Sequence, residues 1–248
     1  WFKTFQYNQS GFKLINTHKR NNILQLSKIG LIPIRCHQKI NGKIKQITIK
    51  KSNNKWFASL VTEYNKSLHK GNKQIGIDLG VINFVADSEG NKIEGPLYLK
   101  HSLNKLKTAH KELSRKLKGS NNREKAKLKL SKIYEKVTNQ RDDFLHKLST
   151  KYIKKCNLIA IEKLNIKNLE HISYNARNIV DCSWNKFTSM LKYKAESAGV
   201  KLIKVNPKNT SKECNNCGNI QDMPLSHRIY NCSNCDASID RDINSAIN

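Results

Sequence analysis

Cys214-Asn215-Asn216-Cys217 and Cys232-Ser233-Asn234-Cys235 are two Cys-x-x-Cys pairs near the end of the chain, and Asp240-Arg241-Asp242-Ile243-Asn244-Ser245-Ala246 follows at once. Two such pairs supply four thiolates, the number that a closed tetrahedral Zn²⁺ site requires. The fourteen residues between the pairs, 218–231, are long enough for one β-hairpin that brings the pairs together. We therefore predict a zinc ribbon over residues 207–238, with a structural Zn²⁺ held by Cys214, Cys217, Cys232 and Cys235.

The charge balance of the chain indicates its partners. Its 248 residues include 46 Lys and Arg against 19 Asp and Glu, a formal net charge of +27. So large an excess favours polyanions, which bind by charge neutralisation and release of counterions, and it predicts a nucleic-acid partner. No apolar run of about eighteen residues is present, and no basic amphipathic anchor with a wide apolar face, so we expect no membrane partner.

Cysteine usage indicates the compartment. Four of the seven cysteines form the Cys-x-x-Cys pairs, which suits metal binding in a reducing compartment rather than a disulfide framework. We expect a cytoplasmic protein. Cys36, Cys156 and Cys182 are scattered, and we interpret them as ordinary core or surface thiols. The chain begins at Trp1 without a Met, which we interpret as the sign of a fragment.

The first 72 residues are typical of β-structure. Residues 43–49 and 55–61 are predicted as the two strands of a hairpin around the turn Ser52-Asn53-Asn54. Shorter strands are predicted over 22–26 and 31–35. Several short strands with polar turns favour a small, partial β-barrel of the OB type.

A long helical segment is predicted over residues 101–156. Apolar residues recur at helical spacing from Leu103 to Leu117, and again from Ala126 to Leu148 after the break at 119–122. This pattern predicts a hairpin of two helices. Residues 101–155 hold 17 Lys and Arg against 5 Asp and Glu, a local net charge of +12, which favours contact with phosphates over a merely solvated face.

The remaining residues of the segment 73–206 predict a mixed α/β core. Strands are expected over 74–81, 157–162 and 200–205, and a helix over 183–197. Strand, hairpin, helices, strand, helix and strand in this order are typical of an α/β domain with helices packed on a sheet.

Three acids of this core and of the last segment stand out. Asp78 lies inside an apolar strand, Glu162 ends another, and Asp242 falls in the first turn of a predicted closing helix. An aspartate in an apolar strand is costly to bury unless it is paired or binds a metal. Three converging carboxylates would hold two divalent cations at a phosphodiester, and oxygen ligands favour Mg²⁺ or Mn²⁺.

Each acid also has a plainer interpretation when taken alone. Glu162 could be a strand-end acid that pairs with Lys163, and either Asp240 or Asp242 could simply cap the closing helix. The order of the three acids beside a zinc ribbon in a strongly basic chain favours the metal-binding interpretation.

The whole set of motifs resembles TnpB, the OrfB-type protein of insertion sequences, which is related to type V CRISPR effectors and to the Fanzor proteins. Three blocks match the RuvC motifs of that family: Gly76-Ile77-Asp78-Leu79-Gly80, Ile161-Glu162-Lys163-Leu164-Asn165-Ile166 and 240–246. Residues 139–147 on the helical segment and 210–218 at the ribbon match as well. The resemblance covers roughly residues 30–248.

The resemblance implies an RNase H-like (RuvC) nuclease with Asp78, Glu162 and Asp242 as its metal-binding catalytic triad. Asp242 is preferred to Asp240 because the last acid of the family lies two residues before an Asn. Residues 1–72 would be part of a wedge β-barrel, 73–206 the nuclease core with its inserted basic hairpin, and 239–248 the last RuvC motif. Family members cut double-stranded and single-stranded DNA under the guidance of an RNA derived from the transposon end.

The sequence departs from the family pattern in length, because members usually carry an additional helical recognition lobe. The leading hypothesis is a metal-dependent, RNA-guided DNA endonuclease. Its alternative is a truncated, catalytically inactive protein that binds guide RNA and DNA, or a repressor. A DNA strand-transferase, which would join DNA rather than only cut it, is a third possibility. The sequence sets no expectation for the oligomeric state.

Overall fold

The computed structural model describes residues 4–16, 21–64, 71–164, 181–224 and 226–248. The chain divides into two compact units, Trp1–Ser67 and Leu68–Asn248. No helix within the described ranges is long and apolar enough to cross a membrane.

The first unit consists of two three-stranded antiparallel sheets. One has the order β1-β5-β6 and the other the order β2-β3-β4. The strands are β1 (Thr4–Asn8), β2 (Phe12–Ile15), β3 (Asn22–Leu26), β4 (Gly30–Ile34), β5 (Lys43–Ser52) and β6 (Lys55–Glu63). Alternate residues of both sheets meet in one apolar core around Leu24, Leu26, Ile47 and Ile49. The predicted strands over 22–35 and 43–61 are confirmed, whereas β1 and β2 were not predicted.

The turn between β5 and β6 follows from two asparagines. Asn53 and Asn54 have φ of 46° and 62°, and both therefore adopt the left-handed conformation that a two-residue hairpin turn needs. Asparagine tolerates this conformation better than other residues with a side chain. The predicted hairpin is confirmed.

The second unit is built on a five-stranded mixed sheet with the order β11-β10-β7-β8-β9. Its strands are β7 (Lys73–Asp78), β8 (Asn83–Asp87), β9 (Lys92–Glu94), β10 (Cys156–Glu162) and β11 (Lys201–Val205). The three strands β7, β10 and β11 are parallel, β8 is antiparallel to β7, and β9 is antiparallel to β8. This sheet confirms the predicted mixed α/β core.

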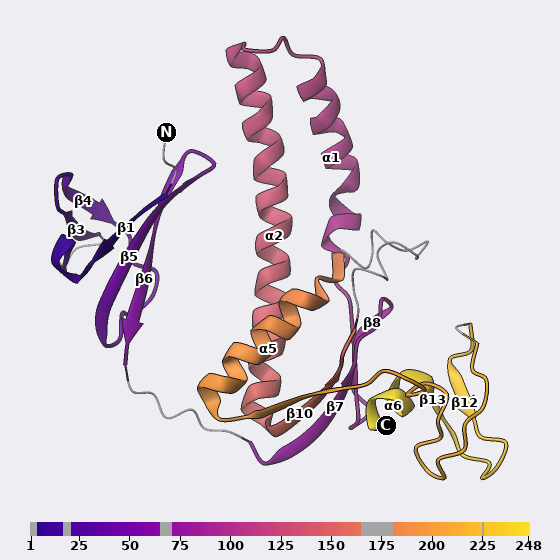
Figure 1. The fold of residues 1–248 in the computed structure, drawn as a ribbon. Helices are drawn as coiled ribbons and strands as arrows, with labels where there is room; N and C mark the ends of the chain where they lie inside the picture. Colours follow the sequence, from indigo (N-terminus) through magenta and orange to yellow (C-terminus); the bar gives the residue numbers. More distant parts are fainter. Residues whose placement is uncertain (1–3, 17–20, 65–70, 165–180, 225) are drawn as a thin grey trace. The chain divides into compact units, whose positions relative to one another are not determined.

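Helices pack against this sheet and extend beyond it (Figure 1). The helices are α1 (Tyr98–Ser114), α2 (Asn121–Lys155), α5 (Trp184–Ala198) and α6 (Arg241–Ile247). The C-terminal part of α2 and the apolar face of α5 bury Leu145, Tyr152, Phe187 and Leu191 in one core with the sheet. The N-terminal part of α2 packs against α1 through Leu106, Ala109 and Leu130.

The predicted helical hairpin is confirmed, with one difference at its turn. The pattern of leucines suggested that the first helix continues through Leu117. Helix α1 ends at Ser114 instead, and Leu117 is 81% exposed. Ser120 explains the start of α2, because its hydroxyl accepts a hydrogen bond from the backbone N–H of Arg123 and caps the helix.

Candidate active site and four-cysteine cluster

Asp78 and Glu162 lie side by side at one edge of the sheet. They are the last residues of β7 and β10, which are parallel neighbours with Ile77 opposite Ile161. The carboxyl ends of parallel strands meet at the same edge of a sheet, so Asp78 and Glu162, which directly follow Ile77 and Ile161, lie next to each other. Two acids that are far apart in the sequence are therefore neighbours in the structure.

Asp242 reaches the same place on helix α6, which follows β13 (Ser238–Asp240). Helix α6 lies against β7, and Gly76 permits this contact: a Cβ atom at Gly76 would lie 1.8 Å from the carbonyl oxygen of Ala246. No side chain fits in that space. Gly76 therefore allows the close approach that brings Asp242 to the edge of the sheet.

The charges of Glu162 and Asp242 act on the carboxyl of Asp78. Burial, followed by these two negative charges, raises the pKa of Asp78 to about 7, and Arg241 opposes the shift. Burial also raises the pKa of Glu162, against the hydrogen bond that Thr210 donates. Buried like charges favour protonation, and a bound cation would relieve the same repulsion.

Asp240 and Asp242 have different partners, although they are only two residues apart. Asp240 caps α6, where its Oδ1 accepts from the backbone N–H groups of Asp242 at 3.0 Å and Ile243 at 3.3 Å. Its other oxygen forms an ion pair with Lys92. Asp242 instead accepts a hydrogen bond at 2.9 Å from Asn83 Nδ2, and its charge acts on Asp78. The carboxylate of Asp240 is occupied in capping the helix, whereas that of Asp242 belongs to the group at the edge of the sheet.

Further side chains orient these carboxylates. The hydroxyl of Thr210 donates to Glu162 Oε1 at 2.6 Å, and that of Ser245 donates to the same oxygen at 3.4 Å. Arg228 Nη1 lies 3.9 Å from Asp242 Oδ1. Analysis of the sequence missed these residues and Asn83, because nothing in their local sequence indicates which acid they contact.

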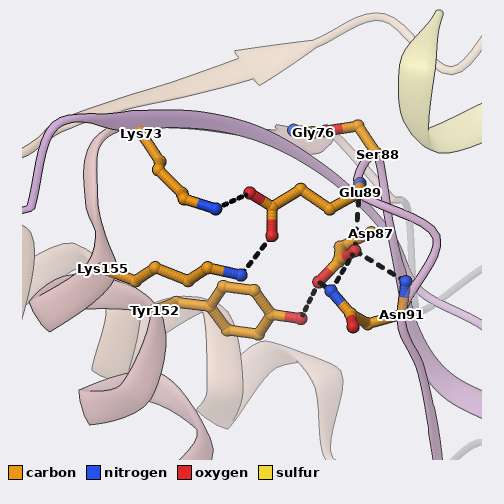
Figure 2. Close-up of polar contacts among 8 residues, drawn as sticks. All are labelled: Lys73, Gly76, Asp87, Ser88, Glu89, Asn91, Tyr152 and Lys155. Carbon is orange, nitrogen blue, oxygen red and sulfur yellow. Dashed lines mark hydrogen bonds and ion pairs between the residues drawn. The ribbon is translucent and has the colours of Figure 1, made fainter.

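Another buried aspartate nearby, Asp87 at the end of β8, has its hydrogen bonds satisfied (Figure 2). It is 2% exposed, and its carboxylate accepts from the backbone N–H groups of Glu89 and Asn91, from Asn91 Nδ2 and from the hydroxyl of Tyr152 on α2. Glu89 in turn bridges Lys73 and Lys155. These bonds hold the hairpin of β8 and β9 against α2 and indicate a structural role.

The four predicted zinc ligands come together in the structure. Their sulfurs all lie within 4.8 Å, with Cys214 Sγ 3.7 Å from Cys235 Sγ and Cys217 Sγ 3.5 Å from Cys232 Sγ. A tetrahedral Zn²⁺ with Zn–S bonds of about 2.3 Å places its sulfurs about 3.8 Å apart. The pKa of Cys217 is lowered to about 6, first by a hydrogen bond from Asn234, which favours the thiolate that a metal binds. The cluster therefore fits a zinc ion.

The helical hairpin carries a groove lined by lysines, with a volume of about 750 Å³. Its basic lining residues on the two helices are Lys105, Lys125, Lys129, Lys132 and Lys136. The four lysines of α2 are spaced 4, 3 and 4 residues apart, so they share one face of that helix. No Asp or Glu is among the groove's lining residues, although Lys129 pairs with Glu112. The groove therefore carries five lysines and no acidic side chain in its lining.

Comparison with known proteins defines the class of the chain. Residues 47–173 match the family model OrfB_IS605, described as "Probable transposase", and residues 184–248 match the TNB domain of Cas12f1-like proteins. The chain therefore belongs to the OrfB family of IS605-type insertion sequences, and the resemblance to TnpB seen in its motifs is confirmed.

Particular relatives carry names that agree with this class. A protein of Streptomyces pristinaespiralis named "Putative RNA-guided DNA endonuclease" is 37% identical over 78% of this chain and 49% of its own length. "Putative RNA-guided DNA endonuclease InsQ" of Escherichia coli K12 is 30% identical over 98% of this chain and 64% of its own length. The chain thus spans about half to two thirds of these relatives.

The fold is similar to that of Cas12f1. The chain matches a Cas12f1 chain, solved by cryo-electron microscopy in complex with single guide RNA and target DNA, with a TM-score of 0.64 at 18% identity. The match covers 98% of this chain and 64% of that one. This likeness supports a common fold for the two proteins.

Proposed function

We propose that the chain is the nuclease part of a transposon-encoded, RNA-guided DNA endonuclease of the TnpB type. The observation that carries the proposal is the group of three carboxylates, Asp78, Glu162 and Asp242, brought to one sheet edge from three separate elements. The endonuclease names of the relatives agree with this group but do not by themselves assign its residues.

The three carboxylates would hold two Mg²⁺ or Mn²⁺ ions at the edge of an RNase H-like (RuvC) core. Two such ions stabilise the attacking and the leaving oxygens when a phosphodiester is cut. Asp78, with a pKa of about 7, would lose its proton as a cation binds, and Thr210 and Asn83 would keep the neighbouring carboxylates in position.

The cysteine cluster would hold one structural Zn²⁺ beside this centre. All four ligand positions are filled by Cys214, Cys217, Cys232 and Cys235, so the ion would have no open position for a substrate. Its role would be to order the short ribbon around β12 (Ile229–Asn231) and β13, which leads into the helix that carries Asp242.

The basic groove of α1 and α2 would bind the phosphates of the heteroduplex between guide RNA and target DNA. Lysine is the commonest residue in its lining, and lysines supply point charges rather than a pattern of donors and acceptors, so they suit binding that depends on backbone and shape rather than on base sequence. Both double-stranded and single-stranded DNA would be substrates, and the β unit over residues 1–72 would be part of a wedge domain that contacts the same nucleic acids.

Cleavage of plasmid DNA tests the proposal. The chain would be co-expressed with the DNA that flanks its gene and purified with the RNA that it retains. We expect Mg²⁺-dependent cutting that requires this RNA and that Asp78→Ala abolishes while RNA binding persists. Asp222→Ala is the matched control, because Asp222 is an exposed aspartate paired only with Lys212, and this variant should cut normally. Retained RNA without cutting by the unaltered chain would favour the inactive binding protein instead.

A further inference from the structure

Helix α6 is too short to determine its own position. It has seven residues, and isolated helices shorter than about 12 residues are marginal in water. The placement of Asp242 on this helix therefore depends on the contacts that α6 makes with the rest of the protein. One side of the helix rests on β7 at Gly76, and another contacts the segment 209–215, which carries the first cysteine of the cluster.

Asn244 is the residue of α6 that joins the helix to the cysteine cluster. Its side chain is 0% exposed. The Oδ1 atom accepts a hydrogen bond at 3.0 Å from the backbone N–H of Asn215, and Nδ2 donates at 2.7 Å to the carbonyl of Glu213. These two backbone groups flank Cys214, so one buried amide holds the chain on both sides of a zinc ligand.

The same segment also reaches the second carboxylate of the sheet edge. Asn248 Nδ2 donates to the carbonyls of Thr210 at 2.9 Å and Glu213 at 2.7 Å, and the Thr210 hydroxyl donates to Glu162 at 2.6 Å. A continuous set of hydrogen bonds therefore leads from the backbone around Cys214 to Glu162 and to the helix that carries Asp242.

We propose that Asn244 is a positioning residue that couples the zinc cluster to the carboxylate centre. Zinc orders the backbone around Cys214, Asn244 transmits that order to α6, and α6 places Asp242 beside Asp78. The inference rests on the proposed function, because it takes the three carboxylates as a cation site. Coupling between two binding sites is reciprocal, so zinc strengthens the binding of the divalent cation at the carboxylates and that cation strengthens the binding of zinc.

A role in packing alone predicts something different. Replacing Asn244 by Ala leaves the buried N–H of Asn215 without its acceptor, and this lowers stability in either case. Only the coupling role makes cation affinity at the carboxylates depend on zinc in the unaltered chain and removes that dependence in the variant. The decisive measurement is therefore the affinity for Mn²⁺ with and without zinc, in the unaltered chain and in Asn244→Ala.

The affinity for Mn²⁺ is measured by titration, and the electron paramagnetic resonance signal of the free ion reports how much Mn²⁺ remains unbound. The full chain is studied with zinc bound and after zinc removal, as unaltered protein and as Asn244→Ala. We expect zinc removal to weaken Mn²⁺ binding about five-fold or more in the unaltered chain. The zinc-loaded variant should bind Mn²⁺ as weakly as the zinc-free protein, with little further change when its zinc is removed.

The matched control is Asn231→Ala. Asn231 is an exposed asparagine of β12 whose Oδ1 accepts from the hydroxyl of Ser238, and among the described residues its side chain has no hydrogen bond to α6. This variant should keep the zinc dependence of the unaltered chain. If Asn244→Ala fails to retain zinc, Asn244→Asp serves in its place: it keeps the shape and the acceptor for Asn215 but removes the donor to the carbonyl of Glu213, and it too should reduce the zinc dependence of Mn²⁺ binding.

The possible failures are distinguishable. Mn²⁺ affinity that does not depend on zinc in the unaltered chain overturns the coupling and leaves the carboxylate centre intact. Absence of any Mn²⁺ binding that responds to Asp78→Asn contradicts the proposed function instead. Amide hydrogen exchange then decides the coupling: exchange in α6 should become faster without zinc in the unaltered chain and should not respond to zinc in Asn244→Ala.

Discussion

Replacing Asp78 by Asn should stabilise the cation-free protein, although it removes a residue that the proposed activity needs. The carboxyl of Asp78 has its pKa raised from 3.8 to about 7 by burial and by the charges of Glu162 and Asp242. The folded state therefore binds more protons than the unfolded state between these two pH values, and its stability falls as pH rises through that window. Above about pH 7 the full cost of the buried charge is present.

The size of this cost follows from the pKa shift. A shift of about three units at 1.4 kcal/mol each sets an upper limit of about 4 kcal/mol, and partial exposure to water reduces it to about 2 to 4 kcal/mol. Asparagine has nearly the same shape as aspartate and carries no charge. For a unit of this size we expect the midpoint of thermal unfolding to rise by roughly 5 to 10 °C at about pH 8.

Thermal unfolding followed by circular dichroism measures the effect. The buffer contains no added divalent cation and no strong chelator, so that zinc stays bound. The difference between Asp78→Asn and the unaltered chain should be smaller at about pH 5.5 than at about pH 8. Added Mn²⁺ should stabilise the unaltered chain, by about 2.7 kcal/mol at a hundred-fold excess over its dissociation constant, and leave the variant unchanged.

Asp87→Asn is the matched control, because it changes a buried aspartate on the neighbouring strand in the same way. The carboxylate of Asp87 accepts hydrogen bonds from Glu89, Asn91 and Tyr152, so this variant should lose about 2 kcal/mol or more. A gain of stability in Asp78→Asn and a loss of stability in Asp87→Asn would distinguish a carboxylate that destabilises the fold and serves the proposed activity from one that stabilises the fold. Equal or lower stability of Asp78→Asn at about pH 8 would refute the reasoning.

Three further results are expected. Mn²⁺ affinity should rise with pH up to about pH 7, by no more than about ten-fold per unit, because the cation displaces the proton of Asp78; a titration at fixed pH values that shows no such rise contradicts the pKa argument. Gly76→Ala should abolish DNA cleavage with zinc still bound, since its Cβ would meet the backbone of α6 at 1.8 Å, whereas Gly95→Ala, whose nearest neighbour lies 3.8 Å away, should cut normally. Cys214→Ser should lose the single zinc measured by elemental analysis and Cys36→Ser should keep it; equal zinc in both would exclude Cys214 as a ligand.

Most elements of the fold could be predicted because their causes are local. The helical hairpin follows from leucines at helical spacing and from an interruption that includes Gly119, although α2 already begins at Asn121, within the predicted break at 119–122. The hairpin of β5 and β6 follows from two asparagines that accept left-handed backbone. Strands β1 and β2 were missed, although β1 is as long as the predicted β3 and β4. β1 pairs with β5 and β2 pairs with β3, and the sequence of one strand alone does not indicate its pairing partner in the folded protein.

The candidate site could be predicted only in part, because some of its features depend on contacts between residues that are far apart in the sequence. The end of a strand at Glu162 was predicted, whereas Asp78 was expected inside a strand over 74–81; β7 ends at Asp78 instead, and parallel pairing brings the two acids together. The difference between Asp240 and Asp242 depends on distant partners, Lys92 for one and Asn83 for the other. The catalytic role of the triad stays a prediction, and the positions of its residues support it.

The most direct test of the central claim is the location of cations in crystals of the chain soaked in Mn²⁺. Anomalous scattering measured at the manganese and zinc absorption edges distinguishes the two metals. The account predicts one zinc among Cys214, Cys217, Cys232 and Cys235, and two manganese ions held by Asp78, Glu162 and Asp242. Manganese absent from these three carboxylates, or bound at Asp240 instead, would contradict it.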